Sequence, residues 1–217
     1  MTPLVFLGGT GPEGLGLALR FAAAGEPVVI GSRVADRAAA AADKIRAAVP
    51  GARAEGYENL DALGRSDRIV LAFPFEGLPP FLDTVGNRLD GKLVIDVIVP
   101  LVFKPGFCEV APIPGAASVG ELIQARAPGA RVVSAFKNLP AETLGELSVP
   151  MEGDVVLCGN DQAARGEVAA LAGKIPGLRA VDAGKIGNSR YLESITALLV
   201  NLNRKHKAHT SIAVLGL

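Results

Sequence analysis

The sequence predicts an α/β protein of the Rossmann type, in which helices cover both faces of a doubly wound, mostly parallel sheet. Short runs of Val, Ile and Leu alternate with longer segments of helical periodicity, and Gly or Pro marks most junctions. Most of the expected strands are apolar throughout, as strands covered on both faces should be. A glycine-rich turn follows the first of them, which is the third sign of this fold.

Each predicted element follows from these patterns. The expected strands cover residues 4–8, 27–31, 53–57, 68–73, 92–97, 131–136, 154–158 and 179–182. The expected helices cover residues 13–25, 34–49, 77–89, 119–127, 141–147, 162–175 and 189–204. A closing strand-like segment, HTSIAVLGL, completes a small carboxy-terminal α/β extension. We therefore expect a Rossmann domain over residues 1–184 and a small unit over residues 185–217 that caps the sheet edge or makes a dimer.

Composition narrows the function. The 217 residues carry 22 basic and 22 acidic side chains and no Trp, which argues against a general nucleic-acid binder. The longest apolar run, residues 93–103, is too short to cross a bilayer and contains Asp96 and Pro100, so we expect no membrane contact. The amino terminus enters directly on a strand without a basic leader, which predicts a cytoplasmic protein.

The two cysteines, Cys108 and Cys158, stand outside any metal-ligand or redox spacing. We expect both to be free, buried thiols and expect no metal site.

The glycine-rich turn predicts dinucleotide binding. Residues 9–14 read Gly-Thr-Gly-Pro-Glu-Gly, which is the GxGxxG spacing between a strand and a helix. Gly9 would permit the tight turn, Gly11 would let backbone approach a pyrophosphate, and Gly14 would let the helix pack on the strand. The amino terminus of the helix would then offer free N–H groups to the phosphates.

The end of the second strand predicts a preference for NADP over NAD. An NAD site usually carries Asp or Glu there, to accept from the ribose 2′-hydroxyl. This chain has Ser32 and Arg33, with Arg37 one helical turn later, so a hydroxyl and two guanidiniums stand where a 2′-phosphate would bind. Cations at a helix amino terminus oppose the dipole, which argues against a purely structural role.

The catalytic motifs of two common classes of dehydrogenase are missing from the sequence. The Tyr-x-x-x-Lys pair of short-chain dehydrogenases fails because Tyr57 is followed four residues on by Asp61, and Tyr191 by Ile195. A 3-hydroxyacid dehydrogenase would have Lys four residues after Gly187, where Tyr191 stands. Hydride transfer between two heterocyclic cofactors needs stacking and orientation more than a protein acid, so the second substrate can itself be a cofactor.

Several segments together resemble the NADPH-dependent reductases of coenzyme F-420, a 5-deazaflavin. They are GGTGPEGLGLALRFAAAGEPVVIGSR, VLAFPFEG, LVIDVIVPLVF, VVSAFKNLPA and DAGKIGNSRYLESITALLVNLN, in family order over nearly the whole chain. The ending KAHTSIAVLGL resembles the bacterial branch. The resemblance implies reversible, direct hydride transfer between NADPH and the deazaflavin, with the two rings stacked in a cleft, and a homodimer formed through the carboxy-terminal unit.

The resemblance also implies roles for individual residues. Two sets would bind the phosphates of NADP: Thr10, Ser32, Arg33 and Arg37 the adenosine 2′-phosphate, and Gly11, Pro12 and Glu13 the pyrophosphate. The nicotinamide would pack against Phe73, Pro74, Val99 and Pro100. The deazaflavin would face Lys137, Asn138 and Leu139, of which the first two are the catalytic candidates. Lys137 departs from the His expected there, and implies a longer, charged donor or a different acceptor.

The basic terminus is the last candidate. From residue 185 onward five Lys and Arg face one acid, Glu193. The resemblance places this terminus near the acceptor, so Lys207, with help from Arg204 or His209, is expected to bind an anionic acceptor tail; a solvated surface is the alternative. Two other functions stay open: an NADPH-dependent reductase of a flavin, a pterin or ferric iron, and a non-catalytic NADP-sensing module.

Overall fold

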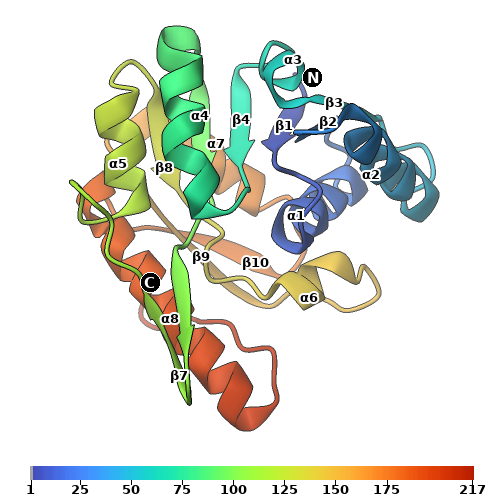
Figure 1. Ribbon diagram of the computed structural model, residues 1–217. Coiled ribbons are helices and arrows are strands. Elements are labelled where there is room, and N and C mark those ends of the chain that lie inside the picture. Colours follow the sequence, from blue (N-terminus) through green and yellow to red (C-terminus); the bar gives the residue numbers. More distant parts are fainter. Residues whose placement is uncertain (1) are drawn as a thin grey trace.

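The computed structural model describes residues 2–217 and confirms the predicted Rossmann-type fold (Figure 1). Eight strands form one sheet in the order β10-β9-β8-β5-β4-β1-β2-β3. Their bounds are β1 Leu4–Leu7, β2 Val28–Ser32, β3 Ala54–Glu58, β4 Arg68–Leu71, β5 Leu93–Asp96, β8 Arg131–Ser134, β9 Gly153–Gly159 and β10 Leu178–Asp182. All neighbours pair in parallel except β8 and β9, which run antiparallel, so each of the eight expected strands is present.

The strand order reverses between β1 and β4. From β1 the chain winds outward through β2 to β3, and then returns to β4, β5 and β8 on the other side. At such a reversal the loops after neighbouring strands leave toward opposite faces, which opens a crevice at the carboxyl ends of the strands. The fold therefore places its ligand site above β1 and β4.

Two helical layers cover the sheet. Their bounds are α1 Pro12–Ala23, α2 Ala35–Ala48, α3 Asn59–Leu63, α4 Leu78–Val85, α5 Val119–Arg126, α6 Ala141–Gly145, α7 Gln162–Ala172 and α8 Ser189–His206. One core cluster joins α1, α2, α6 and α7 to one face, and a second joins α3, α4, α5 and the start of α8 to the other. Side chains alternate between them, since Phe6 of β1 belongs to the first cluster and Val5 to the second.

A β-hairpin that was not expected follows β5. Its strands, β6 Leu101–Lys104 and β7 Phe107–Val110, pair antiparallel around a turn in which Gly106 has φ of 87°. Pro before a glycine of positive φ is the chemistry of a type II turn. The apolar run over residues 93–103 contains both β5 and β6, separated by Pro100. Because the run looked continuous, the sequence pattern did not predict β6 and β7 as separate strands.

The closing strand expected over residues 209–217 is absent, which corrects the predicted make-up of the carboxy-terminal unit. After α8 the backbone turns at Lys207, whose φ and ψ are 51° and 49°, and then runs without strand pairing. The Ile212 carbonyl accepts from the Asp154 backbone, and the Val214 N–H donates to the Asp154 carboxylate. The Asp154 carboxylate therefore accepts from a backbone N–H of the tail that would otherwise pair with a neighbouring strand.

Figure 1 shows α8 and β7 extending together from the end of the sheet where the carboxyl ends of the strands lie. Residues 185–217 form a short 3₁₀ helix, Ile186–Asn188, followed by α8 and an irregular tail, and their treatment as a separate unit stays a prediction. Within residues 2–217, no helix combines the length and apolarity needed to cross a membrane. Cys108 and Cys158 are both free and buried, as predicted.

Candidate active site

A cleft of about 410 Å³ opens at the carboxyl edge of the sheet, above the reversal of strand order. Four strand ends and α8 contribute its walls. The lining residues are Gly11, Pro12 and Glu13 after β1; Ala72, Phe73, Pro74 and Phe75 after β4; Val97, Ile98, Val99 and Leu101 after β5; residues 137–142 after β8; Thr196, Leu199, Val200 and Asn203 on α8; and Thr210.

The glycine loop has the geometry of a phosphate cradle. Gly8, not Gly9, takes the positive φ of the turn, at 74°. A Cβ on Gly14 would lie 2.9 Å from the Ala72 Cβ, so this glycine allows α1 to pack against the end of β4. A Cβ on Gly11 would meet only the Gly8 carbonyl oxygen, at 4.0 Å, so its backbone faces open space. Gly9 belongs to the same tight turn, because a Cβ on it would lie 2.8 Å from the Phe6 carbonyl oxygen. The geometry at Gly11 and Gly14 is compatible with the roles predicted for them, which stay predictions.

Glu13 occupies the first turn of α1 and lines the cleft. Its Oε1 atom is buried and has no hydrogen-bond partner within the described chain. Burial, with a smaller contribution from the Glu142 carboxylate, raises the pKa of Glu13 to about 8. The surroundings of Glu13 therefore disfavour its ionised form.

The residues expected at the 2′-phosphate lie outside the cleft lining: Thr10 follows β1, and the other three lie at or just beyond the end of β2. Ser32 ends that strand and is buried, and its hydroxyl accepts a 3.3 Å hydrogen bond from the Val34 N–H. Thr10, Arg33 and Arg37 are exposed. The structure thus leaves both guanidiniums available to a ligand at the amino end of α2.

The apolar wall is built from the loops after β4 and β5. The Phe73 ring packs edge-on against Phe81 of α4, with 5.2 Å between ring centroids, which fixes its orientation. Phe73, Pro74 and Val99 line the cleft, as expected. Pro100 is buried and does not line it; Leu101 faces the cleft instead.

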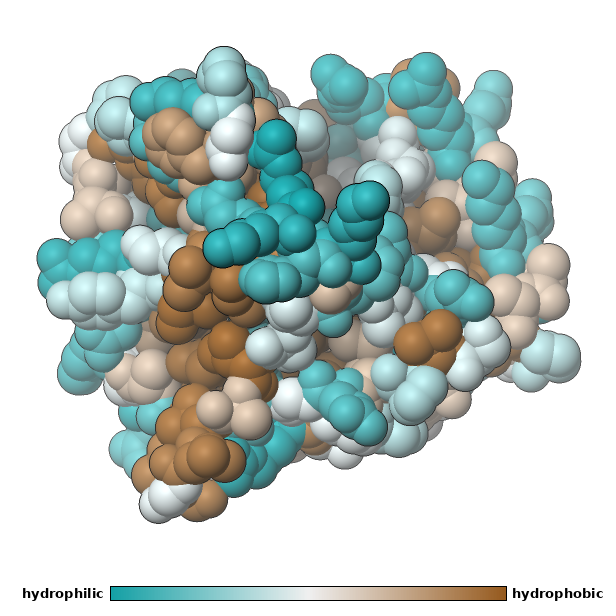
Figure 2. Space-filling model, turned by 90° about the horizontal axis from the view of Figure 1, so that it is seen from below, coloured by the Kyte–Doolittle hydropathy of each residue, from teal (hydrophilic) through white to brown (hydrophobic). Residues whose placement is uncertain are grey.

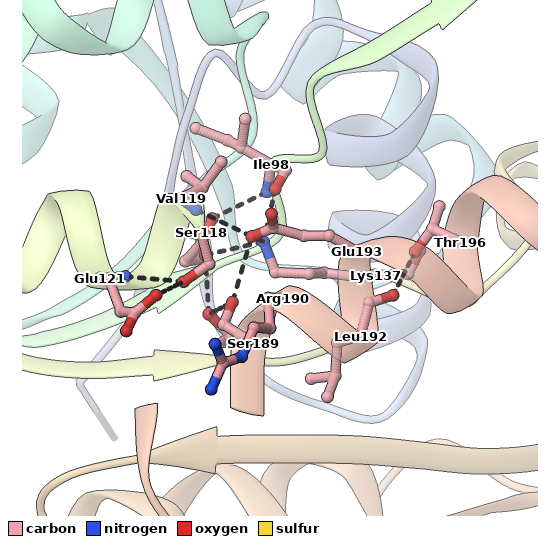
Figure 3. A network of polar contacts seen from close by, with 12 residues as sticks. Ile98, Ser118, Val119, Glu121, Lys137, Ser189, Arg190, Leu192, Glu193 and Thr196 are labelled. Carbon is pink, nitrogen blue, oxygen red and sulfur yellow. Dashed lines mark hydrogen bonds and ion pairs between the residues drawn. The ribbon is translucent and has the colours of Figure 1, made fainter. Parts of the chain in front are cut away.

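Lys137 lies in a buried ion cluster beneath this wall (Figure 3). Its ammonium nitrogen is 2.7 Å from Asp96 Oδ2 and 3.4 Å from Glu193 Oε1, and it donates to the Ile98 carbonyl. All three carboxylate and ammonium side chains are at most 1% exposed. These three contacts join the loop after β5 to α8 through Lys137. Lys137 also lines the cleft, and the catalytic role expected of it stays a prediction.

The cluster extends into the start of α5. Glu193 Oε1 accepts a 2.9 Å bond from the Val119 N–H, at the amino terminus of that helix, and a 3.2 Å bond from the Ser189 hydroxyl. Ser134 donates to Asp96 over 2.8 Å and lies 2.7 Å from Ser189. Burial is the main cause of the raised pKa of Glu193, and its Oε2 has no hydrogen-bond partner within residues 2–217.

The other residues of the AFKNLPA stretch are also held by the protein. Asn138 is buried at the cleft and its amide donates to the Asp154 carbonyl over 2.8 Å, and its expected catalytic role stays a prediction. Phe136 has φ of 60°, an uncommon value for a bulky residue, and its ring packs edge-on against Phe21 at 5.7 Å. Leu139 lines the cleft and remains a candidate contact for the acceptor.

The basic terminal residues lie beside the cleft rather than in it. Asn203 and Thr210 line the cleft on either side of them in sequence, and Asn203 Oδ1 accepts from both the N–H and the hydroxyl of Thr210. The Arg204 guanidinium lies 6.0 Å from the Phe103 ring centroid, and His209 Nδ1 is 3.6 Å from the Glu142 carboxylate. Lys207 is exposed where α8 ends.

Sequence patterns missed the partners of Lys137. Asp96 ends an otherwise apolar strand and Glu193 is the single acid in a basic segment, so each was visible as an exception. The cleft residues Glu142 and Thr196 carried no comparable signal, because nothing in their local sequence distinguishes them from solvent-exposed helix positions.

Comparison with known proteins agrees with this geometry. Residues 3–100 match the family model described as NADP oxidoreductase coenzyme F420-dependent. The F420-dependent NADP reductase of Methanocaldococcus jannaschii is 38% identical over 94% of both chains, and that of Methanothermobacter thermautotrophicus is 38% identical over 96% of this chain and 92% of its own. A crystal structure from Arthrobacter sp. FB24 superposes with a TM-score of 0.80 and 25% identity, covering 99% of each chain.

The family assignment rests on the similarity to two named reductases along nearly their whole length. The order of the strands and the open glycine loop agree with it. The chain belongs to the family of F420-dependent NADP reductases.

Proposed function

We propose that this protein is an oxidoreductase that transfers a hydride between NADPH and the 5-deazaflavin coenzyme F-420. The observation that carries the proposal is one cleft with walls from two different parts of the chain: the glycine loop after β1 and helix α8. One cleft with two such walls suits two ring systems held face to face. When bound, the two cofactors supply the hydride chemistry, and the protein supplies their orientation.

The chain's residues fit NADP. The backbone at Gly11 is open toward the cleft, and α1 begins at Pro12, so the free N–H groups of its first turn can receive the diphosphate. Ser32, Arg33, Arg37 and Thr10 would hold the 2′-phosphate, and the wall of Phe73, Pro74 and Val99 would pack on the nicotinamide. In this arrangement Ala72, Val97 and Leu199 exclude water from the reacting face.

The acceptor's phosphodiester and glutamate tail would meet the basic terminus. Lys207 is exposed at the carboxyl end of α8, and Arg204 and His209 are adjacent in sequence to the cleft residues Asn203 and Thr210. Exposed charges act through screened attraction, so the acceptor KM should rise with ionic strength. Lys207→Ala should raise that KM and weaken its salt dependence, whereas Lys44→Ala on the distant α2 should change neither.

A homodimer is proposed for the same end of the molecule. Figure 2 shows apolar side chains gathered on the face seen from below, the end at which Figure 1 places α8 and β7. Phe103, Phe107 and Val102 of the hairpin and Leu198 of α8 are all exposed there, Phe103 by 64%. Exposed apolar groups of this size favour association. Sedimentation at micromolar concentration should give twice the chain mass, and a monomer would contradict the proposal.

One assay tests the proposed reaction. The protein is mixed with NADPH and coenzyme F-420, and loss of the visible absorbance of the oxidised deazaflavin is followed. Turnover with F-420, and none with FMN or FAD, is expected. Turnover only with a flavin, a pterin or ferric iron would identify the alternative acceptor, and NADPH binding without any turnover would identify a sensing module.

A further inference from the structure

The cleft contains an acid that the proposed hydride transfer does not use. Glu13 lies in the first turn of α1, at the place where the NADP diphosphate is proposed to bind. A buried carboxylate normally accepts several hydrogen bonds, yet Oε1 of Glu13 accepts none from the described residues. In the ionised form, Oε1 would be out of contact with water and the carboxylate would lie next to a ligand that is itself anionic.

The charged groups around Glu13 do not favour its ionisation. Glu142 of α6 also lines the cleft, and its negative charge disfavours ionisation of Glu13. Arg20 keeps α6 in place, since its guanidinium donates to the carbonyls of Thr143, Leu144, Glu146 and Val149. Of the basic side chains near the cleft, His209 lies with Nδ1 3.6 Å from the Glu142 carboxylate, and the Lys137 ammonium is already surrounded by acceptors.

We propose that Glu13 binds the diphosphate of NADP as a neutral carboxylic acid, donating its own carboxyl proton to a phosphate oxygen. The proton makes the side chain a donor where the cleft has no free cationic side chain, and it removes a like charge from beside the phosphates. The raised pKa of about 8 agrees with this form of the side chain at neutral pH. The inference deepens the proposed function and rests on its placement of NADP.

The proposal predicts that the affinity for NADP depends on pH, and that the titration of Glu13 alone causes this dependence. If only the protonated form binds, a group with a pKa of about 8 lowers the affinity about 30-fold between about pH 7 and about pH 9.5. The 2′-phosphate is fully ionised above pH 7, so its own titration adds nothing in this range. Binding, not turnover, is the correct measurement, because the hydride transfer itself has a proton balance.

The test is the Kd of NADPH, from its fluorescence or by calorimetry, across this pH range. The wild type should lose affinity with rising pH, and Glu13→Gln, whose amide also donates, should keep the neutral-pH affinity within about threefold and show no pH dependence. Glu142→Gln removes the neighbouring like charge and should move the wild-type midpoint to lower pH. Glu152→Gln, at an exposed position outside the cleft, is the matched control and should behave as wild type.

Two results would overturn the inference alone: NADPH affinity that does not change with pH in the wild type, or a pH dependence that persists in Glu13→Gln. Absence of NADPH binding at every pH would overturn the proposed function as well. If Glu13→Gln does not fold, the shift in Glu142→Gln decides, and an unmoved midpoint there refutes the assignment to Glu13.

Discussion

Asn201 of α8 and Cys108 of β7 exchange two hydrogen bonds. The Cys108 N–H donates to Asn201 Oδ1 over 2.6 Å, and the Asn201 amide donates to the Cys108 carbonyl over 2.8 Å. The side-chain amide thus pairs with the outer edge of the hairpin as another peptide unit would. This pair joins the exposed apolar hairpin to α8, the helix that lines one side of the cleft.

Replacing Asn201 should loosen that end. Asn201→Ala leaves the Cys108 N–H and carbonyl without partners, and we expect it to lower the free energy of unfolding by about 2 kcal/mol. Urea denaturation measures this change. The exposed Asn87→Ala is the control and should cost less than about 0.5 kcal/mol. Equal effects of the two substitutions would show that the paired hydrogen bonds contribute nothing.

The buried Lys137–Asp96 pair should be strongly coupled. Lys137→Met leaves the Asp96 carboxylate buried without its cation, at an expected cost of about 3 to 5 kcal/mol. Adding Asp96→Asn removes the uncompensated charge and should restore part of that stability. A double-mutant cycle, measured by urea denaturation, tests this. Additive effects would mean that the two groups act independently despite their 2.7 Å separation.

Discrimination between NADP and NAD should depend on the two exposed arginines. Arg33→Ala and Arg37→Ala each remove a cation from the proposed 2′-phosphate site, and each should raise the KM for NADPH about 10- to 100-fold with little change for NADH. Arg46→Ala, farther along the same helix and paired with Asp43, is the control. Equal KM values for NADPH and NADH in the wild type would contradict the assignment.

Stability in acid should depend on Asp154. Hydrogen bonds from Arg179 and from the Val214 N–H lower its pKa from 3.8 to about 2. A lowered carboxyl pKa stabilises the folded state above the unfolded pKa, and this contribution is lost as the pH falls from about 4 through about 2. Because Arg179 is half exposed, we expect about 1 to 2 kcal/mol. Asp154→Asn should be less stable than wild type at neutral pH, and the difference should shrink in acid.

The thiols should be unreactive in the folded protein. Burial raises the pKa of Cys158 to about 12 and also raises that of Cys108, so almost no thiolate is present near neutral pH. Ellman's reagent should therefore titrate neither thiol until urea unfolds the chain. Rapid reaction of one equivalent in the native protein would show that a cysteine is accessible.

Local sequence patterns were sufficient for the sheet and the glycine loop. Apolar runs mark strands covered on both faces, and the GxGxxG spacing is read within one turn. Pro105-Gly106 is a turn signal, yet the hairpin was not predicted. The reason is that the apolar residues on both sides of Pro100 looked like one strand with a proline in it. The segment over residues 209–217 has strand composition, but pattern alone does not reveal whether a neighbouring edge is available for pairing.

The site was harder to predict because its central contacts are distant in sequence. Lys137 was expected to contact the acceptor, yet its partners lie at positions 96, 98 and 193 and meet it only once β5, β8 and α8 are in place. The same holds for Asn138, whose partner is the backbone of β9. Polar residues at strand ends indicate a site, but the sequence does not distinguish a side chain that contacts ligand from one that holds the wall.

The ion cluster under the cleft also limits how this chain can evolve. Exchange of Lys137 for an uncharged residue leaves the Asp96 and Glu193 carboxylates without their cation in the core. Exchange of Asp96 first leaves the ammonium with the more distant Glu193 carboxylate, at 3.4 Å, so either first step is costly. Positions 96 and 137 are therefore expected to be inherited as a pair, and lineages with His at the second position should carry an uncharged residue at the first. Laboratory evolution that varies one codon at a time would seldom cross between the two solutions.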